Sequence, residues 1–222
     1  IHPIGLSKQK EKTKRIAIYI SLFFAAWFVR VLIYLVFDRT LPTETLRSLS
    51  SFTFRILFWV VPVFLYLRYV DKTSSLQYLK LTTNLKTAVL ASIGVILVGV
   101  VWQVVLLAVK ADQFSGEITF WGLFNGVIVP PINEEILMRG FILTKLREVT
   151  TFWKANIITS LVFVAIHWPG WNLLFDNKLD WMLKTSVSIF ILSLLLGYLV
   201  RKTDSLWPSI VLHAVNNLIS SI

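Results

Sequence analysis

The sequence predicts an all-α integral membrane protein built as a bundle of about seven transmembrane helices. Of its 222 residues 56% are hydrophobic, whereas a typical soluble domain has ~45–50%. The mean hydropathy is +0.72. The apolar residues gather into several long runs rather than spreading through one core, which is typical of a polytopic membrane protein. Lys and Arg lie mainly in the short loops between the runs, where such residues set topology.

The predicted helices follow the apolar runs in chain order. They cover residues 16–37, 52–69, 87–109, 118–146, 153–168, 182–200 and 206–222. We expect one membrane domain over residues 1–222, opening with a basic tail at residues 1–15. The first run is too long for a signal peptide and lacks a small-residue cleavage site, so it is predicted to be an uncleaved helix. Arg30 within it is expected to snorkel outward.

The charge distribution restricts the partners and the orientation. The net charge is +10, which in a soluble protein would suggest nucleic acid. Because these charges sit in loops between membrane helices, we expect them to meet anionic lipid of the bilayer and expect no nucleic-acid partner. The positive-inside rule places the N-terminus of this multi-pass cell-membrane protein in the cytoplasm. The chain has no cysteine, which excludes disulfides, thiol nucleophiles and Cys-ligated zinc.

Two adjacent carboxylates and an arginine interrupt the fourth run. Burying one charge at bilayer depth costs ~2.5–3.5 kcal/mol, so three together need a reason. On a helix Glu135 and Arg139 are i, i+4 neighbours and are predicted to pair. Glu134 points about 100° away from Glu135 and is left without an obvious counter-ion. It is either a functional carboxylate or part of a helix end that anchors near the headgroups.

Three further polar residues are predicted to share the depth of Glu134. Depth is counted at about 1.5 Å per residue from the charges of the cytoplasmic loops, Lys145, Lys154 and Asp204. On this count Glu134 lies about 16 Å deep, His167 about 20 Å, His213 about 14 Å and Asn217 about 20 Å. Asn217 follows His213 by four positions, so both project from one helix face. The sequence therefore predicts that a carboxylate, two imidazoles and an amide meet near mid-membrane.

This constellation suits hydrolysis. Glu134 can act as general base on a water, with His167 helping to position that water. His213 and Asn217 can donate hydrogen bonds to a developing oxyanion. The Glu135–Arg139 pair would support the helix rather than react. The same Glu134, His167 and His213 could instead hold a zinc ion with one open position, and their spacing does not choose between the two chemistries.

The three motifs together resemble a known family. The series Glu134-Glu135-x-x-x-Arg139, Phe163-x-x-x-His167 and His213 followed by Asn217 is similar to that of the CAAX protease and bacteriocin-processing family, also called the Abi or type II CAAX prenyl endopeptidase-like family. The resemblance covers residues 118–219; the preceding residues match only as apolar helices.

The resemblance implies an intramembrane protease whose substrate is a membrane-associated protein or peptide. It implies that Glu134 is the catalytic glutamate, that His167 positions water, that His213 and Asn217 stabilise the oxyanion, and that Phe163 supports the site. The family also contains bacteriocin-immunity proteins and scaffolding members, which leaves a non-catalytic regulator as the alternative. Its members have been described both as metalloproteases and as metal-free glutamate proteases.

We expect a glutamate-activated water and no cofactor, with zinc as the alternative. The possible ligands come from three helices without an i, i+4 pair, and Asn217 is a poor zinc ligand. In addition, no free carboxylate stands near His167 or His213 in the sequence, although zinc-bound histidines usually donate their second ring nitrogen to one. A transporter, in which Glu and His relay protons, is the remaining rival; the inverted repeats or paired broken helices that would favour it are not found in the sequence.

Overall fold

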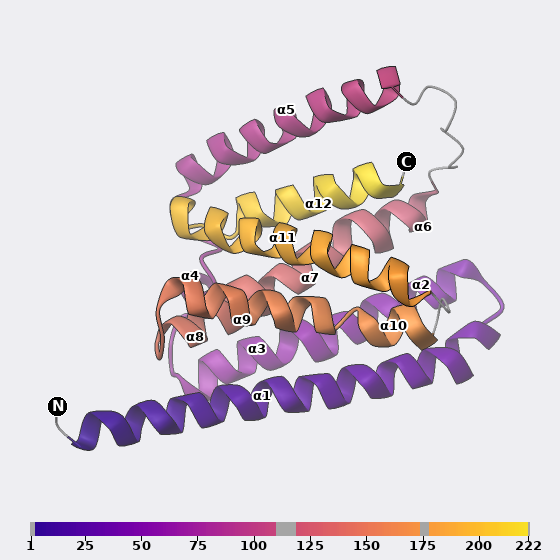
Figure 1. Ribbon diagram of the computed structural model, residues 1–222. Helices are drawn as coiled ribbons and strands as arrows, with labels where there is room; N and C mark the ends of the chain where they lie inside the picture. The colour runs from indigo at the N-terminus through magenta and orange to yellow at the C-terminus, as the bar shows by residue number, and fades with distance from the viewer. Residues whose placement is uncertain (1–2, 110–118, 174–177, 222) are drawn as a thin grey trace.

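Every regular element in the described residues, 3–109, 119–173 and 178–221 of the computed structural model, is a helix. The predicted all-α class is therefore confirmed. Figure 1 shows the helices lying side by side, with α1 (Pro3–Val36) and α5 (Leu85–Val109) at opposite edges. Next to α5 lies α12 (Trp207–Ser221), and α11 (Leu179–Thr203) packs along α9 (Phe152–Ala165). The elements that follow α5 in the chain thus lie between α1 and α5.

The basic segment at the start of the chain is helical from Pro3, so the first helix begins earlier than the predicted residue 16. Lys, Gln and Glu are good helix formers, and an apolar helix that follows directly gives them a structure to extend. Glu11 and Arg15 pair across one turn of this extension. A short 3₁₀ turn, η1 (Asp38–Thr40), ends α1.

The second predicted run is one continuous helix that begins eight residues earlier than expected. It comprises α2 (Glu44–Arg55), η2 (Ile56–Val60), α3 (Val61–Leu65) and η3 (Tyr66–Val70). The Thr43 hydroxyl caps it by accepting a hydrogen bond of 3.2 Å from the Leu46 N–H. Because Pro62 cannot donate to the ladder, the turn before it widens, and the Val61 N–H bonds to the Ile56 carbonyl, five residues back.

The fourth predicted run also contains a widened turn before a proline. It comprises α6 (Phe120–Gly122), η4 (Leu123–Ile128), α7 (Val129–Glu135), η5 (Ile136–Leu143) and α8 (Thr144–Arg147), while its predicted first residue, Ile118, lies outside the described residues. Pro130 and Pro131 have no N–H, and the Val129 N–H reaches the Phe124 carbonyl across a wide turn. The wide turn lets α7 begin at the prolines, one turn before the two carboxylates.

The remaining predicted runs are also helical. The run at 153–168 is α9, which ends near the Trp168-Pro169 step, followed by the short α10 (Trp168–Leu173). Asp204, in the left-handed conformation with φ 50°, terminates α11. The predicted last residue of the final helix, Ile222, lies outside the described ranges. A single turn, α4 (Ser75–Tyr78), completes the elements.

Four of the described helices are long and apolar enough to cross a membrane. They are Ser7–Val36, Glu44–Val70, Leu85–Ala108 and Leu179–Thr203. Apolar side chains cover the outer surface of α5, and Val98 is 72% exposed there, which suits contact with lipid rather than water. The chain is therefore a membrane protein. Seven spans, the single domain and the cytoplasmic N-terminus stay predictions.

The most deeply buried segment of the bundle is residues 129–146. Every side chain in it is buried except those of Ile132 and Thr144, which are partly exposed. Its apolar residues join a core that also takes side chains from α1, from the helix containing Pro62 and from α9. Glu135 and Arg139 are completely buried in this segment, so the carboxylates do not form an exposed anchor at a helix end.

Candidate active site

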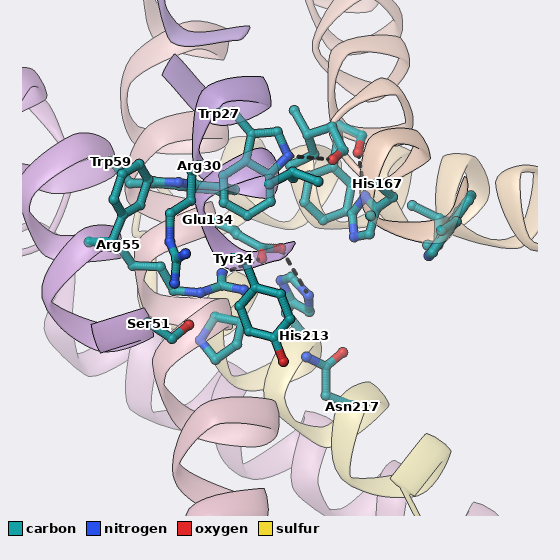
Figure 2. Close-up of a pocket in the computed structure, with 18 of the residues that line it drawn as sticks. Trp27, Arg30, Tyr34, Ser51, Arg55, Trp59, Glu134, His167, His213 and Asn217 are labelled. Atoms are coloured by element: carbon teal, nitrogen blue, oxygen red, sulfur yellow. Dashed lines mark hydrogen bonds and ion pairs between the residues drawn. The ribbon is translucent and has the colours of Figure 1, made fainter. Parts of the chain in front are cut away.

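One cavity brings together the four residues predicted to carry out the chemistry. It measures about 420 Å³, within the ~300–1,000 Å³ typical of ligand pockets. Its lining includes Glu134 on α7, His167 in the turn after α9, and His213 and Asn217 on α12 (Figure 2). The predicted convergence from three helices is therefore confirmed as geometry.

Glu134 has a counter-ion that the local sequence pattern did not reveal. Its Oε1 lies 3.1 Å from Nη1 of Arg55, which comes from the last turn of α2 (Figure 2). The inference that this carboxylate stands unpaired is therefore wrong. The Arg55 guanidinium also lies over the rings of Trp27 and Trp59, which fix its position beside the carboxylate. The second oxygen of Glu134, Oε2, faces His213.

Glu135 and Arg139 form the predicted pair, with 2.6 Å between Oε1 and Nη1. The pair is completed from two other helices. Arg139 Nη2 donates to the Ser193 hydroxyl at 2.6 Å and to the Ser193 carbonyl at 3.2 Å, and the Ser209 hydroxyl donates to Glu135 Oε2. Because both charges are compensated by several polar groups, this buried pair links α7, α11 and α12 at one point.

His213 bridges the two carboxylates. Its Nδ1 lies 3.0 Å from Glu135 Oε1, and its Nε2 lies 3.8 Å from Glu134 Oε2. A carboxylate only accepts, so the ring carries its first hydrogen on Nδ1 and presents Nε2 to the cavity. The 3.8 Å separation exceeds a hydrogen bond, which leaves a space between Nε2 and Glu134 that an oxygen atom can bridge.

His167 is oriented in a similar way by the backbone. Its Nδ1 donates to the Phe163 carbonyl at 2.7 Å, so the neutral ring presents its Nε2 lone pair to the cavity. Phe163 itself packs edge-on against both imidazoles, with centroid distances of 5.1 Å to His167 and 5.6 Å to His213. The Arg139 guanidinium lies 4.5 Å from the same ring. Phe163 therefore contacts both imidazoles and the guanidinium of the buried ion pair.

Asn217 lies at the wall of the cavity one turn beyond His213. Its Nδ2 donates to the Gly126 carbonyl at 2.9 Å, which ties α12 to the wide turn η4. An amide nitrogen carries two hydrogens, so one N–H remains for another acceptor.

The zinc alternative finds mixed support in this geometry. Among the residues whose placement is described, no group of three or more His, Asp and Glu side chains converges as a metal site. Yet both imidazoles direct Nδ1 to an oxygen, as zinc-bound histidines do, and Glu135 is the carboxylate that the sequence did not place beside His213. That argument against zinc is therefore wrong, and the choice between a metal-free site and a zinc site stays a prediction.

The wall opposite the histidines comes from the first two helices, and sequence reasoning missed it. Trp27, Arg30 and Tyr34 line the cavity from α1, and Ser51 and Arg55 line it from α2 (Figure 2). Arg30 is 5% exposed and pairs with Asp38, so the expectation that it snorkels outward is wrong. The available signal was the presence of Arg30 inside the first apolar run and of Arg55 near the start of the second.

The comparison with known proteins agrees with the motifs. Residues 116–219 match the family model described as "Type II CAAX prenyl endopeptidase Rce1-like". This stretch contains Glu134, His167, His213 and Asn217, but neither Arg30 nor Arg55. No curated protein and no solved structure matches the chain. Residues 116–219, which carry the whole motif series, are thus similar to the type II CAAX prenyl endopeptidase Rce1-like family, a family of membrane proteases.

Proposed function

We propose that the protein is an intramembrane endopeptidase that hydrolyses a peptide bond of a membrane-associated protein or peptide. The observation that carries the proposal is the meeting of Glu134, His167, His213 and Asn217 in one cavity. The similarity of residues 116–219 to a protease family supports it. The identity of the substrate, whether a CAAX-type tail or another processed peptide, is left to experiment.

In the proposed reaction Glu134 is the general base. Oε1 is held by Arg55, so Oε2 is the oxygen that takes a proton from water lying between it and the Nε2 lone pair of His167. The water oxygen bonds to the substrate carbonyl carbon, and the carbonyl oxygen becomes the oxyanion. Glu134 then passes its proton to the amide nitrogen as the C–N bond breaks, so one water is consumed for each peptide bond.

The oxyanion is stabilised from α12. Because the Nδ1 hydrogen of His213 points at Glu135, His213 donates to the oxyanion only when Nε2 also carries a hydrogen. The remaining N–H of Asn217 is the second donor. Removing one donor of this kind typically costs about 10²–10³ in kcat.

The first prediction tests these roles. The protein in lipid nanodiscs is incubated with a library of myristoylated random octapeptides, and products are identified by mass spectrometry. Glu134→Gln, His167→Ala and His213→Ala should each lower cleavage at least about 10²-fold, the low end for a general acid–base group. Thermal unfolding should still be cooperative in each variant, and Glu44→Gln, on an exposed carboxylate, should retain full activity.

Two results would contradict this assignment. Undiminished cleavage by purified Glu134→Gln protein would remove Glu134 as the base. No cleavage of any peptide by the folded wild-type protein would instead favour the non-catalytic regulator that other members of the resembled family exemplify.

The second prediction concerns metal. If Glu134 activates water directly, activity should survive exhaustive chelation, and elemental analysis of the active protein should find less than stoichiometric zinc. Glu134, His167 and His213 are the residues that would hold a zinc ion, which would supply a Lewis acid to activate water. Stoichiometric zinc, with activity lost on chelation and restored by added metal, would overturn the metal-free proposal.

A further inference from the structure

Arg30 lines the cavity and carries a buried hydrogen-bond donor that is unused. Nη2 of its guanidinium pairs with Asp38, whereas Nη1 has no hydrogen-bond partner among the described residues. The side chain is buried, yet it belongs to the cavity lining together with Glu134. Figure 2 shows its guanidinium directed toward the same space as the guanidinium of Arg55 and the carboxylate of Glu134. A buried charged donor without a partner costs free energy, so its orientation calls for an explanation.

A purely structural ion pair does not explain this arrangement. On the side away from the cavity, Asp38 of this pair also accepts a hydrogen bond of 3.1 Å from the Ser50 hydroxyl, so the carboxylate has its partners without further help from Arg30. On the near side the guanidinium is held between two aromatic rings, 5.6 Å from the Tyr34 centroid and 5.0 Å from that of Phe54. The group is therefore fixed in place before any ligand arrives, which lowers the entropy cost of binding one.

The charges that face the cavity favour an anion there. Two guanidiniums, of Arg30 and Arg55, and one carboxylate, of Glu134, line it, while Asp38 lies behind Arg30 and outside the lining. Arg55 is engaged by Glu134 and Arg30 by Asp38, but because Asp38 lies outside the lining, the positive end of the Arg30–Asp38 pair is the end nearer the cavity. Arginine binds carboxylates in preference to neutral groups because its planar fork matches their geometry.

We propose that Nη1 of Arg30 binds a carboxylate of the substrate and thereby selects which peptides present a bond to Glu134. The proposal rests on the proposed peptidase function and adds a specificity-determining residue to it. That carboxylate is either the free C-terminus of the peptide or an Asp or Glu side chain; the guanidinium recognises both by the same chemistry. Arg30 lies outside the segment that matches the family, so this selection belongs to the first helix.

The test compares two forms of one substrate library. Myristoylated random octapeptides are synthesised once with a free C-terminal carboxylate and once with a C-terminal amide, and are offered to the protein in nanodiscs. The wild type should cleave the acid form about 10- to 100-fold faster in kcat/KM if the C-terminus is recognised, the range for a hydrogen bond between charged groups. If a side chain is recognised, Asp or Glu should be enriched at one fixed position of the cleaved peptides in both forms.

Arg30→Lys is the decisive variant. Lys keeps the charge for Asp38 but has no second guanidinium arm, so the variant should fold and lose the preference while still cleaving amide-form, non-acidic peptides. Arg68→Lys makes the same exchange at an exposed position and should keep the preference. If Arg30→Lys fails to fold, the double variant Arg30→Gln with Asp38→Asn removes both charges together and serves in its place.

A binding measurement separates this inference from the proposed function. His167→Ala keeps both guanidiniums and Glu134, and the amounts of acid and amide peptides that it retains are compared by mass spectrometry. Selective retention by this variant, lost when Arg30→Lys is added, supports the carboxylate subsite even if the wild type cleaves nothing. Cleavage without any preference for carboxylates, or an equal loss on all peptides in Arg30→Lys, overturns the subsite while leaving the peptidase intact.

Discussion

Arg139 shows, at the scale of single residues, how this protein keeps charge inside an apolar bundle. Its guanidinium contacts Glu135 on its own helix, Ser193 on α11 and the face of Phe163 on α9. None of these groups lies in the cavity lining except Phe163. Arg139 therefore orients Glu135, which in turn orients His213, without itself touching the proposed reaction centre.

Removing this arginine should destabilise the protein. Arg139→Ala leaves the Glu135 carboxylate buried beside His213 without its counter-ion, and breaking a buried pair typically costs ~3–5 kcal/mol. We expect a lower midpoint of thermal unfolding in detergent together with reduced activity. Arg147→Ala, which removes an exposed arginine nearby, should leave the midpoint unchanged. An Arg139→Ala protein that is inactive but as stable as the wild type would assign Arg139 to the reaction itself.

Contacts within a helix were predictable from the sequence, and contacts between distant helices were not. Glu135 and Arg139 are four positions apart, so helical periodicity alone brings them together. Arg55 and Glu134 are 79 positions apart, and their meeting depends on how α2 packs against α7. For the same reason Glu135 was not foreseen as the partner of His213, and one argument about zinc failed.

At the scale of elements, the contact between α9 and α11 depends on a glycine. A Cβ built on Gly197 would lie 1.9 Å from Oδ1 and 2.8 Å from Cγ of Asn156, so the amide occupies the space that a side chain would need. Asn156 donates to the Leu194 carbonyl at 3.0 Å from this position. The close approach therefore holds α9, which leads into the turn that carries His167, in register with α11.

Filling that space should loosen the two helices. In Gly197→Ala the Asn156 amide must move and give up its hydrogen bond, and overpacking of this kind costs ~1–3 kcal/mol. The free energy of unfolding is measured in detergent, with Gly94→Ala as the control because a Cβ there meets nothing within 4 Å. Combining Gly197→Ala with Asn156→Ala should recover part of the loss. Equal stability of Gly197→Ala and the wild type would show that the contact is adjustable.

Apolar runs predicted where helices lie, but not where they begin. Residues 3–15 and 44–51 are helical although they are polar, since caps and neighbouring helices extend an apolar span beyond its membrane-like portion. Pro62 and Pro130 were visible in the sequence, yet the wide turns before them follow from missing N–H groups rather than from hydrophobic pattern.

At the scale of the whole molecule, a cluster of charges joins separate parts of the chain at one end of the bundle. Glu148 accepts from Lys12 of α1 at 2.8 Å, from the Tyr78 hydroxyl at 2.6 Å and from Lys145 at 2.9 Å. Lys145 also pairs with Asp71 at 2.6 Å. Partial burial raises the pKa of Glu148, but the hydrogen bonds from Lys12, Tyr78 and Lys145 outweigh it and lower the pKa to about 2.

This cluster should make stability depend on acid pH. The folded pKa of Glu148, about 2, lies below its ordinary value of 4.5, so the stabilisation is present above pH 4.5 and is lost as pH falls from there toward 2. The midpoint of thermal unfolding, measured from pH 4.5 down to pH 2, should fall less steeply in Glu148→Gln than in the wild type. Glu44→Gln should follow the wild-type curve. Identical curves for wild type and Glu148→Gln would show that the cluster does not hold the elements together.

The origin of the two cavity walls has a consequence for how members of such a family diverge. The wall that carries Glu134 and the histidines lies within the stretch that matches the family, and the wall that carries Arg30 and Arg55 lies before it. Inheritance of the matched stretch can therefore keep a reaction constant while substitutions in the first helices alter which molecules reach it. For this protein, the match to the family therefore bears on the proposed reaction, whereas the proposed selection of substrates depends on the first 55 residues.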